Sequence, residues 1–277
     1  DFFARYEAFE KAIHECYPDI RLIGSAGPDI TSERYKMAWD FYKEKVPQKE
    51  NFCYAVDEHY YVRPEWFYEH TDFYDEYPRD VKVFYGEYAA QQTDGMNKDY
   101  ANTLGGALAE AAFLTGVERN ADVVVLASYA PLFARVGYAQ WAPDMIWFDE
   151  KTAYGTPSYY VQKLYGENLG TVTVPMKGQE KELRTAGIYA NVCLDEQTDE
   201  LIIKVVNHNA CEQALELQSE GFAFATQIKC SVMTGDEADY NCIAHPDKIT
   251  VVEEEKKFDG SIVLPANSFV VARVKKN

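Results

Sequence analysis

The sequence predicts an α/β region over residues 1–168 followed by an all-β region over residues 169–277. In the first region, short apolar runs alternate with helical patterns, which is typical of a parallel sheet with right-handed crossovers. After Gly170 the chain changes to short, often alternating β-type runs separated by turn residues. We find no amphipathic helix among these runs, so they favour a two-sheet antiparallel β-sandwich with a jelly-roll-like arrangement.

A helix is expected at the start of the chain. Apolar positions recur at steps of four and three, as on one face of an amphipathic helix. These positions are Phe2, Tyr6, Phe9, Ile13 and Cys16. The pattern predicts an amphipathic helix with these residues on its apolar face, with Asp1 as a possible N-cap and Pro18 just past its end.

Four strand-helix units follow this helix. The predicted strands are residues 19–28, 52–61, 81–88 and 122–131, and the predicted helices are residues 32–45, 64–77, 104–117 and 157–166. Asn97 or Asp99 is a candidate cap for the third of these helices. A complete barrel of eight such units takes about 250 residues. The first region therefore contains half of a (β/α)8 barrel, or TIM barrel, and the family resemblance given below implies that it is the second half.

Composition limits the function. Hydrophobic residues make up 47% of the chain and aromatic residues 14%, including 21 Tyr. Such aromatic content suits sugar-stacking surfaces but is more often used in a large core. The net charge of −18 argues against nucleic acid and against electrostatic docking to a membrane, because both need clustered Lys and Arg. A neutral substrate, or simple solubility, is more consistent with this negative charge.

The six cysteines form no C-x-x-C pair, so the sequence offers no zinc spacing. Cys193, Cys211, Cys230 and Cys242 are expected to pair only if the protein matures in an oxidising compartment. We find no signal peptide or membrane-length apolar run. The first residues resemble the interior of a larger protein, whose compartment the sequence does not identify.

Polar side chains follow each predicted strand, where such folds place their chemistry. Glu87 ends the strand KVFYGEY, and His59 and Tyr61 end the strand before it. Gln140 and Trp141 lie in a long loop after the last strand. A carboxylate, an imidazole, phenols, an amide and an indole together suggest a carbohydrate site. Taken alone, Glu87 is equally a solvated loop residue.

Several of these segments carry a family resemblance. They are HYY at residues 59–61, GEYA around Glu87, and the blocks ASYAPLF, QWAPDMIWFD and YGTPSYYVQKLYGENLG between residues 127 and 170. Over residues 1–170 the chain resembles the C-terminal part of an α-L-arabinofuranosidase of glycoside hydrolase family 51, closest to the plant-like branch. The β-sandwich is similar to the domain that follows the barrel in this family.

The resemblance implies a retaining glycosidase that needs no metal or organic cofactor. Glu87 matches the nucleophile, and Tyr61 matches the tyrosine that orients it. His59 matches a histidine near the nucleophile, Gln140 matches a substrate-binding amide, and Trp141 is a candidate wall of the sugar site. Structural roles remain open for Tyr61, as a core aromatic, for His59, and for Trp141, as a loop anchor.

Asp57 and Glu58 precede the HYY segment and are rival carboxylates. Because they are adjacent in a strand, they point to opposite faces, and at most one of them faces the site. We expect both to have structural or supporting roles.

The chain differs from the family in that it lacks the residue that acts as general acid and base. Retention needs a second carboxyl group about 5 to 5.5 Å from the nucleophile. The family supplies it as the Glu of an Asn-Glu pair after the fourth strand, and no Asn-Glu pair occurs in this sequence. We therefore expect the chain alone to be inactive. The resemblance implies that its parent releases terminal α-L-arabinofuranosyl residues from polysaccharides, and such a substrate suits a secreted or periplasmic protein.

Two further expectations follow. The open half-barrel would expose two sheet edges, covered by the missing N-terminal half or by self-association. The alternative function is a carbohydrate-binding or scaffolding module carried by the β-sandwich, since sandwiches commonly bind glycans and fold alone does not fix function.

Overall fold

The computed structural model describes residues 2–91, 102–177 and 179–277, and the predicted caps Asn97 and Asp99 lie outside this part of the chain. The chain divides into two compact units built from interleaved segments. The first unit contains residues 1–61, 73–89 and 120–130, and the second contains residues 62–72, 90–119 and 131–277.

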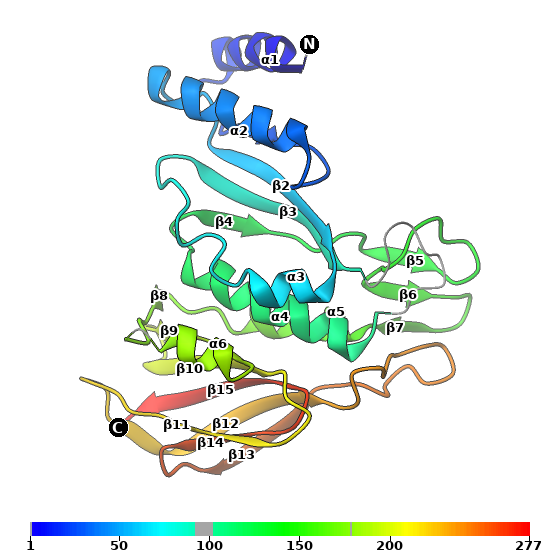
Figure 1. The fold of residues 1–277 in the computed structure, drawn as a ribbon, viewed down its shortest axis with the longest axis vertical. Coiled ribbons are helices and arrows are strands. Elements are labelled where there is room, and N and C mark those ends of the chain that lie inside the picture. The colour runs from blue at the N-terminus through cyan, green and yellow to red at the C-terminus, as the bar shows by residue number, and fades with distance from the viewer. Residues whose placement is uncertain (1, 92–101, 178) are drawn as a thin grey trace. The chain divides into compact units, whose positions relative to one another are not determined.

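The core of the first unit is a four-stranded sheet with the strands in chain order (Figure 1). Its strands are β1 (Ile23–Ser25), β2 (Ala55–Val62), β3 (Lys82–Ala90) and β4 (Val124–Ala127). The β1–β2 and β3–β4 pairs are parallel. The amide of Lys82 donates to the carbonyl of Tyr54 at the start of β2 and β3, so these strands begin side by side. The parallel sheet predicted from the alternating pattern is confirmed.

Two helices belong to the first unit, α1 (Phe2–Cys16) and α2 (Glu33–Lys45), and a short 3-10 helix, η1 (Val46–Gln48), follows α2. Ser32 caps α2, since its side chain accepts from the amide of Tyr35. The helix predicted at residues 32–45 is therefore confirmed.

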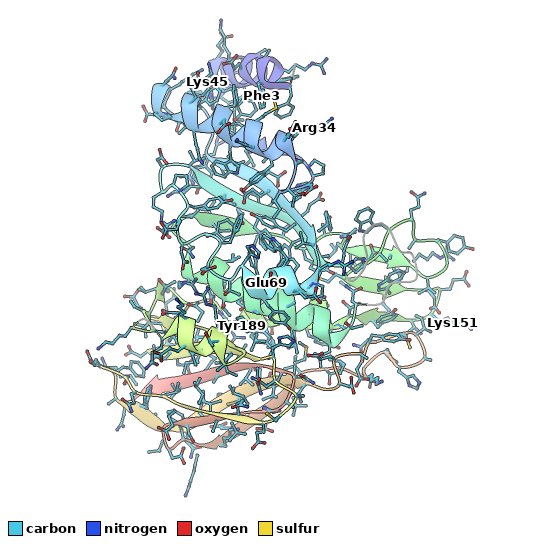
Figure 2. The ribbon with its side chains drawn as sticks, in the orientation of Figure 1. Phe3, Arg34, Lys45, Glu69, Lys151 and Tyr189 are labelled. Atoms are coloured by element: carbon cyan, nitrogen blue, oxygen red, sulfur yellow. The ribbon has the colours of Figure 1, made fainter. Side chains whose placement is uncertain are left out.

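The apolar face predicted for α1 is wrong in part. Phe9 is 67% exposed, and Phe2 and Cys16 are also exposed. Phe3, which is not on the predicted face, lies toward α2 (Figure 2). Its ring stacks on that of Phe41 with centroids 4.6 Å apart, and Tyr6, from the predicted face, packs edge-on against the same ring. The apolar residues of α1 extend around more than one face, so spacing alone does not select the buried one.

A buried carboxylate joins β2 to its neighbours in the first unit. Glu58 is fully buried, and its two carboxylate oxygens accept five hydrogen bonds. The donors are four phenols and one indole, Tyr35 (2.7 Å), Trp39 (2.6 Å), Tyr60, Tyr74 (3.1 Å) and Tyr77 (2.9 Å). Burial raises the pKa of Glu58, and the hydrogen bonds oppose this shift. We call this set the Glu58 cluster.

In the second unit, three helices precede the antiparallel strands: α3 (Pro64–Glu69), α4 (Leu104–Arg119) and α5 (Pro157–Glu167). The helix predicted at residues 64–77 ends at Glu69 and continues as turns, because its later aromatic residues point into the Glu58 cluster rather than along one helix face. The helix α4 is buried on nearly every side and contacts α3, α5 and strands β9, β10 and β15. At Gly116 an added Cβ would lie 1.9 Å from the carbonyl oxygen of Thr71, so the glycine allows close backbone packing.

The C-terminal part of the second unit is antiparallel. Its six-stranded sheet has the order β13-β12-β15-β10-β9-β8, and a two-stranded sheet pairs β11 with β14 (Figure 1). The strands are β8 (Val172–Thr173), β9 (Ile188–Asp195), β10 (Glu200–Asn207), β11 (Gln213–Glu216), β12 (Phe224–Thr234), β13 (Val252–Lys257), β14 (Ser261–Leu264) and β15 (Ser268–Lys276). Apolar side chains from both sheets share one core, which includes Val205, Ile262 and Val270.

Two segments of the second unit differ from prediction. A short helix, α6 (Glu180–Thr185), lies in the region predicted to contain none. Its six residues are too few to show a helical period. The loop predicted after β4 also contains a three-stranded sheet of β5 (Phe133–Arg135), β6 (Ile146–Phe148) and β7 (Ala153–Gly155). These strands are too short to stand out from a loop.

We expect Glu58→Ala to lower the free energy of unfolding by about 3–5 kcal/mol, because it leaves several buried donors without an acceptor. Urea unfolding followed by tryptophan fluorescence measures this loss. Glu50→Ala, at an exposed carboxylate, is the matched control and should change little. Equal stabilities of the two variants would contradict a supporting role for the Glu58 cluster.

A second buried carboxylate, Glu110 on α4, accepts from the amide of Ala90 at 2.8 Å. Burial raises its pKa to about 8. The folded state therefore holds this proton more tightly than the unfolded state, and stability falls as pH rises from the unfolded pKa toward about 8. We expect the difference in unfolding free energy between Glu110→Gln and wild type to shift in favour of the variant between pH 5 and pH 8. The same difference for the exposed Glu212→Gln should stay constant, and a constant difference for Glu110→Gln would contradict the prediction.

Candidate active site

The site lies at the carboxyl ends of β2 and β3 in the first unit. Along β2, alternate residues take different environments, because successive side chains of a strand point to opposite faces. Asp57, His59 and Tyr61 are partly exposed on one face, whereas Glu58 and Tyr60 are buried on the other. The spacing D-x-H-x-Y thus places a carboxylate, an imidazole and a phenol in one row.

Glu87 faces this row from β3. The hydroxyl of Tyr61 donates to Glu87 Oε2 at 2.8 Å, and His59 Nδ1 lies 3.3 Å from the same oxygen. The Glu87 side chain remains 43% exposed, so it can reach a bound molecule. The structure therefore brings together the three predicted site residues of the first unit.

The backbone before Glu87 is fixed by β4. Ser128 Oγ donates to the carbonyl of Gly86 at 2.8 Å, and the amide of Ser128 donates to the carbonyl of Tyr85 at 2.9 Å. Tyr88, directly after Glu87, is fully buried and stacks on Tyr85 with centroids 4.0 Å apart. Glu87 thus projects from a well-anchored segment.

His59 carries most of the electrostatic perturbation at the site. Burial lowers its pKa, but the hydrogen bond to Asp57 and the charges of Asp57 and Glu87 outweigh burial and raise it. His59 Nε2 lies 3.0 Å from Asp57 Oδ2. The imidazole is therefore placed to be cationic between two carboxylates.

The rival carboxylates separate as the strand period requires. Glu58 is enclosed in the Glu58 cluster and cannot reach a substrate. Asp57 lies on the site face and contacts His59. Sequence reasoning treated Asp57 as a supporting group without assigning its partner, although the period of two linking residues 57, 59 and 61 was the available signal.

Gln140 and Trp141 lie in the second unit, between β5 and β6. Gln140 is exposed and Trp141 is partly buried. Their approach to Glu87 stays a prediction.

The described residues also bear on metal binding, membrane insertion and disulfide formation. In that part of the chain no group of three or more His, Cys, Asp or Glu side chains could hold a metal ion. No helix there is both long and apolar enough to span a bilayer. All six cysteines are free thiols, and Cys53, Cys193 and Cys230 are buried.

Comparison with known proteins identifies two matching domain families. Residues 1–79 match the alpha-L-arabinofuranosidase 1 domain, and residues 86–268 match the alpha-L-arabinofuranosidase C-terminal domain.

Curated relatives carry the same name. An extracellular exo-alpha-L-arabinofuranosidase of Streptomyces chartreusis is 44% identical over 178 residues, covering 64% of this chain and 20% of the relative. Alpha-L-arabinofuranosidase 1 of Arabidopsis thaliana is 31% identical over 275 residues, covering 95% of this chain and 37% of the relative. The chain thus spans well under half the length of these relatives.

Solved structures agree with the sequence matches. An arabinose-bound α-L-arabinofuranosidase of glycoside hydrolase family 51 superposes with a TM-score of 0.82 at 28% identity, over 99% of this chain and 42% of that one. The fold is also shared with an α-L-arabinofuranosidase from Thermotoga maritima in its arabinose complex, at a TM-score of 0.75, 16% identity, and 99% and 61% coverage. The chain belongs to the α-L-arabinofuranosidases of glycoside hydrolase family 51, of which it contains a C-terminal part.

Proposed function

We propose that the protein containing this chain is a retaining glycosidase that releases terminal α-L-arabinofuranosyl residues, with Glu87 as the nucleophile. The observation that carries this proposal is the convergence of the Tyr61 hydroxyl and the His59 imidazole on one oxygen of Glu87. A hydrogen bond from one side and an imidazole at ion-pair distance from the other hold this partly exposed carboxylate in a fixed orientation, as nucleophilic attack requires.

We also propose a more specific fold assignment. Residues 1–168, with strands β1 to β4, form the second half of a (β/α)8 barrel, and residues 169–277 form a jelly-roll-like β-sandwich. The half-barrel assignment is supported by the strand order, which follows the chain from β1 to β4, and by the hydrogen bond that places the beginnings of β2 and β3 side by side. Glu87 then lies at the barrel face where such enzymes place their chemistry.

The proposed reaction has two steps. Glu87 attacks the anomeric carbon, and the bond to the departing oxygen breaks while a general acid protonates that oxygen. Water then attacks the glycosyl ester, and the same acid/base removes its proton. The second carboxyl group comes from outside the present sequence, which has no Asn-Glu pair. This chain alone is therefore expected to be inactive.

The rest of the sugar site is proposed from the family resemblance. Gln140 binds a sugar hydroxyl and Trp141 forms a wall of the pocket. The substrate is an uncharged arabinofuranosyl-containing oligosaccharide or polysaccharide, which the net charge of −18 does not repel. Such a polymeric substrate favours a secreted or periplasmic parent.

Replacement of the nucleophile tests the assignment. In the longer protein, Glu87→Gln should lower kcat on an aryl α-L-arabinofuranoside by at least about 10³-fold, because the amide cannot form the glycosyl ester. Glu150→Gln, at an exposed carboxylate, is the control and should leave kcat unchanged. Wild-type turnover by Glu87→Gln would remove Glu87 from the mechanism.

Loss of the phenol should have a smaller effect. Tyr61→Phe removes a 2.8 Å hydrogen bond to Glu87 and keeps the ring. A hydrogen bond to a charged group contributes about 1.5–3 kcal/mol, so kcat/KM should fall roughly 10- to 100-fold. Tyr54→Phe, at a phenol away from Glu87, provides the comparison, and an equal loss in both variants would deny Tyr61 a specific role.

A further inference from the structure

His59 contacts a carboxylate at each of its ring nitrogens. Nε2 lies 3.0 Å from Asp57 Oδ2, and Nδ1 lies 3.3 Å from Glu87 Oε2. A neutral imidazole has a single N–H, and carboxylates only accept hydrogen bonds. The contact to Asp57 is a hydrogen bond, and the contact to Glu87 is within ion-pair distance. Both contacts are therefore favourable at the same time only when the ring carries two protons, one facing each carboxylate.

The missing side chain of Gly86 makes room for Asp57. A Cβ at position 86 would lie 1.8 Å from Asp57 Oδ1 and 3.0 Å from Asp57 Cγ. Gly86 does not have a left-handed backbone, so glycine is required here for space and not for conformation. The residue directly before Glu87 thus accommodates the carboxylate that contacts His59.

His59 is the hydrogen-bond partner of Asp57 among the described side chains. Asp57 Oδ1 is buried without a donor in that part of the chain, and Oδ2 faces His59 Nε2. The neighbouring strands add no competing charge, because β1 (Ile23–Ser25) and β4 (Val124–Ala127) contain no titratable side chain. Among the described residues, the Tyr61 phenol contacts Glu87, and the Tyr42 phenol of α2 faces Asp57. Burial raises the pKa of Tyr42, and the charges of Cys53 and Asp57 add to this shift, so Tyr42 adds no charge of its own near neutral pH.

We propose that Asp57 is a positioning residue, which holds the imidazole of His59 toward Glu87 and keeps it protonated while Glu87 carries the sugar. This inference rests on the proposed role of Glu87 as nucleophile. The raised pKa of His59, with Asp57 as the largest favourable influence on it, supports the geometry.

The role of Asp57 matters most in the step that removes the charge of Glu87, when that carboxylate forms its bond to the sugar. A lone pair of the Glu87 carboxylate forms the bond to the anomeric carbon, and the departing oxygen leaves with its bonding electrons and takes a proton from the general acid. Glu87 is then an uncharged ester, and His59 has lost one of its two anionic neighbours. Asp57 remains, so the imidazolium stays in place to stabilise the carboxylate that re-forms when water breaks the ester.

The direct test is the titration of the His59 ring in the 277-residue chain by ¹⁵N NMR, with His59→Gln to assign its signals among the five histidines. Asp57→Asn keeps an acceptor for Nε2 but removes the charge, and it should lower the His59 pKa by about 1 unit or more. Asp40→Asn makes the same charge change at an exposed residue of α2 and should leave the His59 pKa unchanged. An unchanged His59 pKa in Asp57→Asn would overturn the proposal.

A second variant tests the contact between Asp57 and His59 without changing any charge. Gly86→Ala must displace the Asp57 carboxylate, so it too should lower the His59 pKa. Gly166→Ala, where an added Cβ has open space, should not. If Gly86→Ala leaves the His59 titration as in wild type, Asp57 does not hold the ring through this contact.

Kinetics of the longer protein separate this inference from the proposed function. Asp57→Asn should lower kcat/KM and move its high-pH limb to lower pH, whereas a merely structural loss would lower activity equally at all pH values. If Glu87→Gln keeps its activity, the proposed function fails, whatever the titration shows. If Glu87→Gln is inactive but Asp57→Asn keeps both the wild-type pH profile and the wild-type His59 pKa, only the role of Asp57 fails.

Discussion

The hydrogen bond from Tyr61 to Glu87 is the contact on which the functional account depends. It joins the ends of two parallel strands and requires that β2 and β3 keep their register, because a shift of one residue would turn Tyr61 to the other face. The Glu58 cluster secures that register from behind, since Glu58 holds the opposite face of β2 against aromatic residues of α2 and of the segment before β3. The buried carboxylate of Glu58 and the proposed nucleophile Glu87 thus both depend on the position of β2.

The two faces of β2 show how environment assigns roles to similar side chains. Asp57 and Glu58 are adjacent carboxylates, yet one contacts an imidazole at the site and the other accepts five hydrogen bonds away from solvent. Burial raises the pKa of Glu58, and its donors oppose that shift. On the site face, the charges of Asp57 and Glu87 raise the pKa of His59 against the effect of burial. The array of Asp57, His59 and Glu87 therefore carries one positive charge between two negative ones when the ring is protonated.

Much of this arrangement could be predicted from the sequence. The alternating pattern predicted a parallel sheet, the strand-end positions predicted Glu87, His59 and Tyr61 as neighbours, and the family resemblance was confirmed. The errors have physical reasons. Phe9 is apolar but exposed, because α1 carries aromatic residues on more than one face. The helix after Pro64 ends early, because Tyr74 and Tyr77 serve the Glu58 cluster. The fit of Asp57 against Gly86 could not be predicted, because it depends on how β2 and β3 lie beside each other and produces no periodic pattern in the sequence.

The central claim is that the carboxylate of Glu87 forms a covalent bond to the sugar. Its most direct test is to treat the longer protein with a slowly hydrolysed 2-fluoro arabinofuranosyl substrate, quench it, and locate the added mass by peptide mass spectrometry. The account predicts one sugar on the peptide that contains Glu87, with fragment ions placing it on that residue. A sugar on any other carboxylate would contradict it. Hydrolysis of the substrate with no peptide that ever carries the added mass would contradict it as well.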